Sequence, residues 1–295
     1  FPTRRSSDLL MRALYEVPAP AKLNLFLHIT GRRADGYHLL QSAFMLIDWC
    51  DVLHFERRDG GAITRQDLTT PLPADDLIVR AARALQLATG TTLGAWIGVE
   101  KHLPAQAGMG GGSSDAATCL LALNRLWGLN LSVQRLAAIG LTLGADVPFF
   151  LRGRNAWVEG IGEQITPIDL PAARFVVAKP PQGLETRLIF TDPGLKRDTE
   201  TAIISGFAAS PYGNVFDYGH NDLQPVAQRL CPAVTQALDW LGTQGLKGRM
   251  TGSGSAVFAQ MPQESVLQPA PADWQVRICG NLDVHPLVGW APSDD

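Results

Sequence analysis

The 295-residue chain has an ordinary globular composition, with 46% hydrophobic residues and a formal net charge of −3 from 25 Lys and Arg against 28 Asp and Glu. This composition excludes a largely disordered chain, and a pI near 6.1 excludes the basic surface that nucleic acids and anionic membranes attract. No run approaches the roughly 18 apolar residues of a membrane span. We therefore expect a soluble protein of two domains, with neither a nucleic-acid nor a membrane partner.

The cysteines and the N-terminus indicate the compartment. Cys50, Cys119, Cys231 and Cys279 are far apart, a spacing that predicts neither a zinc site nor a disulfide framework and is typical of reduced thiols in the cytoplasm. Residues 1–10 contain neither an initiator Met nor an apolar segment followed by a small-residue cleavage site. We expect a non-native or disordered extension there, with Met11 as the natural start.

The first half of the chain begins with strands. Residues 22–29 alternate with a period of two, which predicts a strand with Leu23, Leu25, Leu27 and Ile29 on one face and Lys22, Asn24, Phe26 and His28 on the other. A turn over residues 33–36 and an apolar, strand-like stretch over 39–55 follow. Residues 57–70 are typical of a hairpin or loop. Asp75 and Asp76 precede a predicted helix over 77–88, and residues 95–100 predict a short strand.

The remaining elements mix helices and strands. Ala116, Leu120, Leu123 and Trp127 predict one buried face of a helix that ends at Gly128. A second helix is expected from Ser132 to near Gly144, followed by a turn over 144–148, strands over 156–165 and 175–179, and a helix over 221–230. Because strands and helices do not alternate regularly, the fold class is predicted to be α+β.

A glycine-rich segment over residues 108–114 precedes the helix that carries Trp127. Its four glycines allow a close backbone approach, and helix N-terminal amides suit a phosphate. A glycine-rich turn with a serine cap is the alternative, and it stays open at this point. The P-loop motif is excluded because no Lys follows the glycines, and the dinucleotide motif lacks its last glycine. The six histidines are scattered, with no metal-ligand spacing.

Three motifs in order resemble those of the GHMP kinases: residues 20–25 (PAKLNL), 104–114 (PAQAGMGGGSS) and 250–258 (MTGSGSAVF). The resemblance covers about residues 17–282. It implies an N-terminal ATP-binding domain of the ribosomal protein S5 domain 2-like type (11–165), a C-terminal substrate domain (166–295) and a cleft between them. Met109 stands where Leu is usual and Asp115 where Asn is common. Asp115 would add negative charge near a phosphate, so we expect its side chain to point away from the ligand.

Further segments are similar to the GHMP kinases that act on a cytidylyl substrate: residues 20–40, 112–117, 144–148, 189–190 and 221–226. This implies transfer of a phosphoryl group from ATP, with Mg²⁺, to the 2-hydroxyl of a cytidine-diphosphate-linked methylerythritol in the non-mevalonate route to isoprenoid precursors. The alternatives are another small-molecule kinase of the family, of the homoserine or mevalonate type, and a non-catalytic nucleotide-binding protein. A monomer or weak homodimer is expected.

The resemblance also implies roles for individual residues. Asp146 matches the catalytic aspartate and Lys22 its partner lysine, although a purely structural ion pair is the alternative. The expected ATP-binding residues are Lys101, Pro104, Gly108, Met109, Gly110, Gly111, Gly112, Ser113 and Ser114. For Lys101, a solvated side chain is the alternative.

The expected substrate-binding residues are Asn24 near the reacting hydroxyl, Tyr37 stacked on the cytosine, His38 on the edge of the base, Phe190 as the opposing wall, and Thr186 close by. A core position for Phe190 and a turn-capping role for His38 are the alternatives. No magnesium ligand is assigned.

Overall fold

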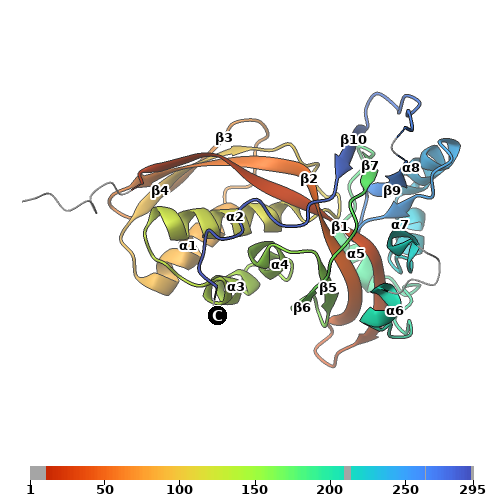
Figure 1. Cartoon of the computed structure of the whole chain (residues 1–295), viewed down its shortest axis with the longest axis horizontal. Coiled ribbons are helices and arrows are strands. Elements are labelled where there is room, and N and C mark those ends of the chain that lie inside the picture. Colours follow the sequence, from red (N-terminus) through yellow and green to blue (C-terminus); the bar gives the residue numbers. More distant parts are fainter. Residues whose placement is uncertain (1–10, 209–213, 263, 294–295) are drawn as a thin grey trace, which may run out of the picture.

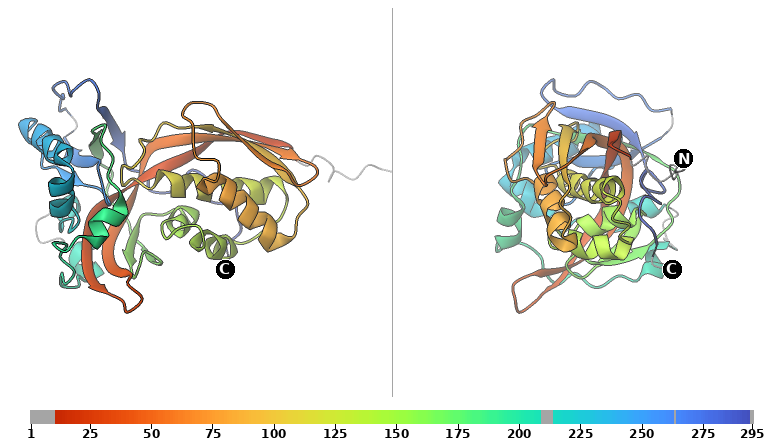
Figure 2. Two further views of the ribbon diagram at one scale, coloured as in Figure 1. Left: turned by 180° about the vertical axis from the view of Figure 1, so that it is seen from behind. Right: turned by 90° about the vertical axis from the view of Figure 1, so that its left-hand side faces the viewer.

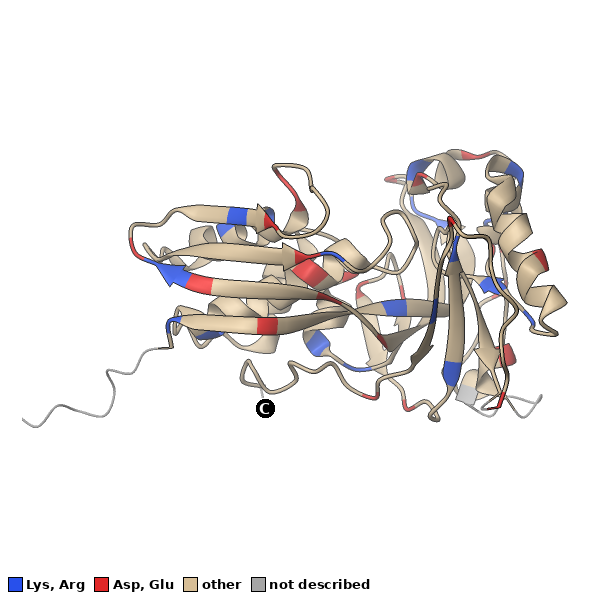
Figure 3. Cartoon of the chain, turned by 90° about the horizontal axis from the view of Figure 1, so that it is seen from above, with Lys and Arg blue, Asp and Glu red and all other residues tan. Residues whose placement is uncertain are grey.

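The computed structural model describes residues 11–208, 214–262 and 264–293, so the predicted extension over 1–10 lies outside the described residues. Two sheets lie side by side, and helices α1 to α4 cover one face of the larger sheet (Figure 1). The α+β prediction is confirmed. Lys and Arg are interspersed with Asp and Glu across both sheets (Figure 3). No helix in the described part of the chain is long and apolar enough to span a membrane.

The larger sheet is built on two long antiparallel strands, β1 (Ala13–Arg32) and β2 (His38–Arg58). The other strands are β3 (Ile63–Asp67), β4 (Gly94–Glu100), β5 (Ala156–Glu159) and β6 (Gln164–Pro167), in the order β3-β4-β2-β5-β6 with β1 paired to β2. The segment predicted as a hairpin or loop therefore contains a strand, β3, parallel to β4. The single strand predicted over 156–165 is a hairpin, because Gly160 and Gly162 adopt positive φ angles of 74° and 118°.

The predicted faces of β1 are only partly right. The register shifts between Asn24 and Leu27. Leu23 and Leu25 pack in one cluster, together with Phe26, whereas Leu27 and Ile29 pack in another. An irregularity of this kind resets the alternation of a strand, so a strict period of two fails across it. Lys22 and Asn24 precede the shift, and their side chains remain neighbours.

Four helices follow in the first half: α1 (Leu77–Thr89), α2 (Gly111–Leu126), α3 (Val133–Leu141) and α4 (Val147–Arg152). Asp76 caps α1, and Ser132, the predicted start of the second helix, caps α3. All four residues of the predicted helical stripe are at most 5% exposed. Helix α4 begins inside the predicted turn because Pro148 fits a first helical turn.

The smaller sheet has the order β10-β7-β9-β8. Its strands are β7 (Arg174–Lys179), β8 (Arg249–Met250), β9 (Val257–Met261) and β10 (Gln275–Gly280). The helices of this half are α5 (Thr186–Thr191), α6 (Ile204–Ala208), η1 (Val215–Asp217), α7 (Gln224–Leu230) and α8 (Pro232–Thr243). Helix α7 starts three residues after the predicted helix.

The chain returns to its first half at the C-terminus (Figures 1 and 2). The backbone amide of Leu282 donates to the carbonyl of Leu46 at 2.9 Å, and that of Val133 donates to Pro292 at 3.0 Å. Leu287 and Ala291 belong to the core beneath the larger sheet. Both long strands also reach the second half, so the domain boundary at residue 165 stays a prediction.

Candidate active site

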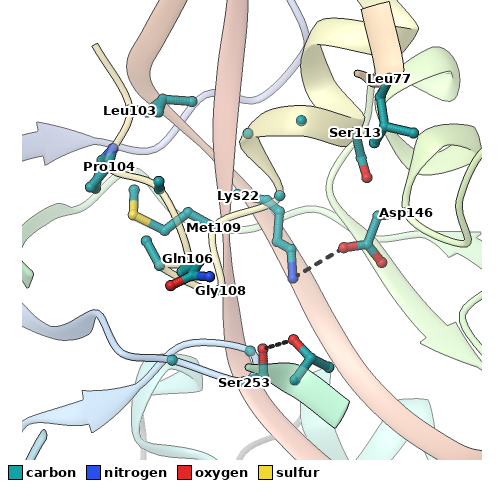
Figure 4. Close-up of a pocket in the computed structure, with 18 of the residues that line it drawn as sticks. Lys22, Leu77, Leu103, Pro104, Gln106, Gly108, Met109, Ser113, Asp146 and Ser253 are labelled. Carbon is teal, nitrogen blue, oxygen red and sulfur yellow. Dashed lines mark hydrogen bonds and ion pairs between the residues drawn. The ribbon is translucent and has the colours of Figure 1, made fainter. Parts of the chain in front are cut away.

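A cavity of about 1220 Å³ collects most of the predicted site residues. Its walls come from β1, the glycine-rich loop, the starts of α2, α4 and α5, and the loop between β8 and β9 (Figure 4). The predicted residues that line it are Lys22, Asn24, Lys101, Pro104, Gly108, Met109, Gly110, Gly111, Gly112, Ser113, Asp146, Thr186 and Phe190. Tyr37, His38 and Ser114 are not among its lining residues.

Lys22 and Asp146 face each other across the cavity (Figure 4), with Lys22 Nζ 3.5 Å from Asp146 Oδ2. The Lys22 side chain is 5% exposed and that of Asp146 is 30% exposed. Asp146 stands at the N-cap position of α4, but its carboxylate accepts no helix amide and so remains available to the cavity. Burial lowers the pKa of Lys22, and the negative charge of Asp146 opposes that shift.

Asn24 fixes the ammonium group of Lys22. Lys22 Nζ donates to Asn24 Oδ1 at 2.5 Å, and Asn24 Nδ2 donates to Ser42 Oγ at 2.9 Å. Because an ammonium group can only donate, the oxygen of the amide must face Lys22. The backbone amide of Asn24 donates to Thr251 Oγ1 at 3.0 Å, which ties β1 to the loop between β8 and β9 (residues 251–256), called here the second glycine-rich loop.

The glycine-rich loop is held tightly against the second glycine-rich loop and β1. Gly108 and Gly110 each have a φ of 72°, and a Cβ on Gly108 would lie 2.2 Å from the carbonyl oxygen of Thr251. The carbonyl of Met109 accepts the Lys22 amide at 3.0 Å. The N-cap of α2 is Gly110, with no side-chain cap bond. The serine-cap interpretation is therefore wrong, and the first amides of α2 are unpaired within the helix.

The two serines of the loop differ in position. Ser113 lies on the same side of the cavity as Asp146 (Figure 4). Ser114 is fully buried, and its hydroxyl donates to the carbonyl of Pro20 at 2.7 Å. The structure thus assigns the Ser114 hydroxyl to the anchoring of α2 on β1.

Helix α5 forms the end of the cavity opposite the start of α2. Thr186 Oγ1 lies 2.7 Å from Ser253 Oγ of the second glycine-rich loop (Figure 4). Phe190 lines the cavity, and its ring centroid is 5.0 Å from that of His38. Arg197 Nε donates to His38 Nε2 at 3.0 Å, and Arg197 also donates to the carbonyl of Phe190 at 3.0 Å.

The Arg197 contact settles the protonation of His38. A guanidinium group can only donate, so Nε2 accepts and the neutral ring carries its proton on Nδ1. Burial, and then the charge of Arg197, lower the pKa of His38. The preceding turn is closed by its own backbone, from Gly36 to Arg33 at 3.0 Å. The turn-capping interpretation of His38 is therefore wrong, whereas Tyr37 is 61% exposed outside the cavity wall.

Lys101 is not a solvated side chain. It is 12% exposed, and Nζ donates to the carboxylates of both Asp51 and Asp115. Burial acts to lower its pKa, but the two carboxylates outweigh burial and raise it. Sequence reasoning missed Asp51 and Arg197. The available signal for Asp51 was an acidic residue, one of two with Asp48, inside the apolar stretch over 39–55, whereas nothing near Arg197 in the sequence points to His38.

Sequence models of the GHMP kinases match residues 76–154 (N-terminal domain) and 204–270 (C-terminal domain). A 4-diphosphocytidyl-2-C-methyl-D-erythritol kinase of Variovorax paradoxus (strain S110) is 70% identical over 95% of this chain and 100% of that protein. The chain belongs to the GHMP kinases. The kinase of the same description from Albidiferax ferrireducens is also 70% identical, over 96% of this chain and 98% of its own length.

Solved structures agree with this family. A 4-(cytidine 5'-diphospho)-2C-methyl-D-erythritol kinase has a TM-score of 0.73 at 33% identity, covering 90% of this chain and 98% of its own. A homoserine kinase from Cytophaga hutchinsonii has a TM-score of 0.63 at 15% identity, covering 96% and 98%, and shows the shared fold alone. The GHMP-kinase fold is therefore confirmed for this chain.

Proposed function

We propose that this GHMP kinase transfers the γ-phosphoryl group of ATP to the 2-hydroxyl of 4-(cytidine 5'-diphospho)-2-C-methyl-D-erythritol, in the non-mevalonate pathway. The observation that carries the proposal is the Lys22–Asp146 pair, 3.5 Å apart in a cavity that also holds the glycine-rich loop and α5. The 70% identical relatives named for this substrate support the choice of alcohol. The cytoplasmic location and the monomer or weak homodimer stay predictions.

The reacting hydroxyl would lie between Asp146 and the γ-phosphate. Phosphoryl transfer has a loose transition state, so the protein acts mainly by positioning and by stabilising charge. Asp146 would accept a hydrogen bond from the hydroxyl, direct it in line, and take its proton as the new bond forms. Lys22, held by Asn24, would stabilise the negative charge that develops on the transferring group.

The phosphates of ATP would lie at the start of α2. The unpaired amides of Gly111, Gly112 and Ser113 and the positive end of the helix suit an anion. The oxygen donors nearby, the Ser113 hydroxyl and the Asp146 carboxylate, fit Mg²⁺, which is usually held by one or two protein oxygens together with phosphates. When bound, Mg²⁺ would neutralise charge on the β- and γ-phosphates.

The cytosine would lie at the α5 end, against Phe190 and within reach of His38. Aromatic stacking supplies affinity to any pyrimidine, so hydrogen bonds to the base edge must distinguish cytosine from uracil. The Nδ1–H of His38 is a donor, which matches the ring N3 acceptor of cytosine and opposes the N3–H of uracil. The stacking role of Tyr37 stays a prediction.

The test is ADP release measured with a panel of alcohols: the cytidylyl substrate, its uridylyl analogue, mevalonate and homoserine. We expect turnover with the cytidylyl substrate, weak turnover with the uridylyl analogue, and none with the others. Preference for mevalonate or homoserine would assign the chain to another activity of the family, and no ATP turnover with any alcohol would favour a non-catalytic nucleotide-binding protein.

His38→Ala should narrow the ratio of kcat/KM between the cytidylyl and uridylyl substrates. An unchanged ratio in the folded variant would contradict the role of His38.

A further inference from the structure

Helix α5 presents a hydroxyl, a guanidinium group and an aromatic ring to the cavity. Thr186, Arg187 and Phe190 line the cavity wall, whereas Ile189 is fully buried in the core of the second half and Leu188 is 51% exposed. Residues three and four positions apart share one face of a helix, and Phe190 is three positions from Arg187 and four from Thr186. The charge of Arg187 therefore lies beside the ring assigned to the cytosine.

The two ends of this helix face border different parts of the site. At its start, Thr186 Oγ1 lies 2.7 Å from Ser253 Oγ, and Ser253 lies across the open part of the cavity from Lys22 (Figure 4). At its end, Phe190 packs against His38. A substrate with its base on Phe190 and its reacting hydroxyl near Lys22 would therefore lay the group that joins them along the first turn of α5. In the cytidylyl substrate that group is a diphosphate.

Arg187 is the cation available at this end of the cavity. The ammonium groups of Lys22 and Lys101, which also line the cavity, are both paired with carboxylates. Arg80 lies on α1, which packs against α2 at the end assigned to ATP. The exposed guanidinium group of Arg187 has neither an ion pair nor a hydrogen bond with any residue in the described ranges. It is therefore free to bind an anion from solution.

The charged groups near Arg187 do not occupy its guanidinium group. Asp192, at the C-cap of α5, pairs with Arg229 at 2.6 Å, and Arg197 donates to backbone carbonyls at the same end. Glu185 also lines the cavity. It precedes the helix by one residue and Arg187 by two, a spacing at which side chains do not face each other.

We propose that Arg187 binds the diphosphate group of the cytidylyl substrate and thereby favours a nucleoside diphosphate ester over a ligand without phosphates. The inference rests on the proposed function, because it requires the cytosine at Phe190 and the reacting hydroxyl near Asp146. A planar guanidinium group can donate two parallel hydrogen bonds to phosphate oxygens. The contact forms at the cost of water alone, since Arg187 gives up no protein partner.

The position of the diphosphate determines which kinetic constant should respond. The bridging phosphates do not react, so Arg187 would contact them equally in the bound substrate and in the transition state. Loss of such a uniform interaction weakens substrate binding and leaves kcat unchanged. Because Arg187 is exposed, salt should screen the interaction and weaken substrate binding in the wild type.

The test compares two ligands that share the cytosine. Calorimetric titration without ATP gives the Kd of the cytidylyl substrate, and competition against that substrate gives the Kd of cytidine, which lacks the diphosphate. Arg187→Gln should raise the Kd of the substrate about tenfold, a loss typical of a hydrogen bond to a charged group, and leave that of cytidine within about twofold. Arg187→Lys keeps the positive charge and should give an intermediate Kd for the substrate.

A matched control and turnover separate this role from a structural one. Arg58→Gln removes the same charge from a half-exposed side chain remote from the cavity and should leave both Kd values unchanged. In turnover, Arg187→Gln should raise KM for the cytidylyl substrate, with kcat and KM for ATP within about twofold of the wild type. A higher salt concentration should weaken substrate binding more in the wild type than in Arg187→Gln.

The outcomes separate the inference from the proposed function. A substrate Kd within twofold of the wild type in folded Arg187→Gln would overturn the role of Arg187 and leave the proposed function intact. Equal increases in the Kd values of the substrate and cytidine would do the same, because they would indicate a disturbed cytosine pocket. Failure of the folded wild type to bind the cytidylyl substrate would overturn the proposed function, and the inference with it.

Discussion

The glycines of the loop before α2 act in two different ways. Gly108 and Gly110 adopt a left-handed backbone conformation, and a Cβ on Gly110 would lie 3.0 Å from the ring of Phe150. Gly112 lies in the first turn of α2, where a Cβ would meet only Leu77 Cδ1 at 3.4 Å. The protein therefore tolerates a side chain at Gly112, whereas a phosphate bound against the helix would not.

Gly112→Ala should leave the fold intact and raise the melting temperature slightly, because alanine is more favourable than glycine in a helix by roughly 0.5–1 kcal/mol. Its Kd for ATP should nevertheless rise about tenfold or more, since the methyl group occupies the path of the phosphates. Calorimetry and thermal unfolding measure both effects. Gly110→Ala is the contrasting variant and should lose stability. Unchanged ATP affinity in Gly112→Ala would contradict the placement of the phosphates.

Sequence motifs predicted the site residues that lie close to one another along the chain. Lys22 and Asn24 lie two residues apart on one strand, and the glycine-rich segment precedes a helix, so both patterns were visible. The partners of His38 and Lys101 were not, because Arg197 is 159 residues from His38 and Asp51 is 50 residues from Lys101. Only the folded chain brings such residues together.

One side chain, Arg197, ties the C-terminal end of helix α5 to the start of β2. Arg197 donates to the carbonyls of Phe190, Asp192 and Leu195 at 3.0, 2.8 and 2.9 Å, and to His38 of the β1–β2 connection. These bonds hold the end of α5 against the start of β2. Arg197 is thus a positioning residue for the proposed cytosine pocket.

Arg197→Met should raise KM for the cytidylyl substrate about tenfold, because His38 and Phe190 lose their common anchor. KM for ATP and the melting temperature should change little by comparison. Steady-state kinetics with each substrate varied in turn separates these effects, and Arg58→Met, at a half-exposed side chain remote from the cavity, is the control. Equal changes in the two KM values would indicate a general structural defect instead.

Elements with strong periodicity were predicted well, and elements with backbone irregularities were not. Helices α1, α2 and α3 begin within two residues of a recognisable capping or glycine signal. The alternation in β1 failed where the register shifts, and β3 was missed because a polar edge strand looks like a loop. Tertiary pairing rather than local preference determines such strands.

At the scale of the whole molecule, the returning C-terminal segment adds a second connection between the two halves, beside the long strands β1 and β2. His285 is 1% exposed, its backbone amide donates to the carbonyl of Gly153 at 2.8 Å, and its Nδ1 accepts the amide of Leu287 at 3.1 Å. Burial lowers the pKa of His285 from 6.5 to about 4. The segment is therefore anchored by a neutral imidazole.

Acid should weaken this anchor. Between pH 6.5 and 4 the unfolded state binds more protons than the folded state, so the free energy of unfolding falls as the pH falls. For His285 the loss amounts to roughly 3 kcal/mol at most. His285→Asn, which keeps an acceptor for Leu287, should flatten the slope of stability against pH, measured by urea unfolding. His28, with a pKa also lowered to about 4 by burial, should preserve part of the slope. An unchanged slope would contradict the role of His285.

The overall architecture was predicted from composition and from three ordered motifs, whereas the path of the chain between its halves was not. A domain boundary drawn along the sequence cannot show that residues 282–292 pack under the larger sheet, or that β1 and β2 belong to both halves. Those contacts arise because the apolar faces of the two halves are completed by segments distant in sequence.

The central claim is that Asp146, paired with Lys22, directs phosphoryl transfer, and Asp146→Asn tests it most directly. The amide has the same size, and the side chain is 30% exposed, so the fold should persist. Asparagine carries no charge and cannot take the proton, so kcat should fall by roughly a hundredfold or more while KM for the alcohol substrate stays within severalfold of the wild type. Asp59→Asn, at an 89% exposed carboxylate, is the control. A folded Asp146→Asn enzyme with near-wild-type kcat would contradict the account.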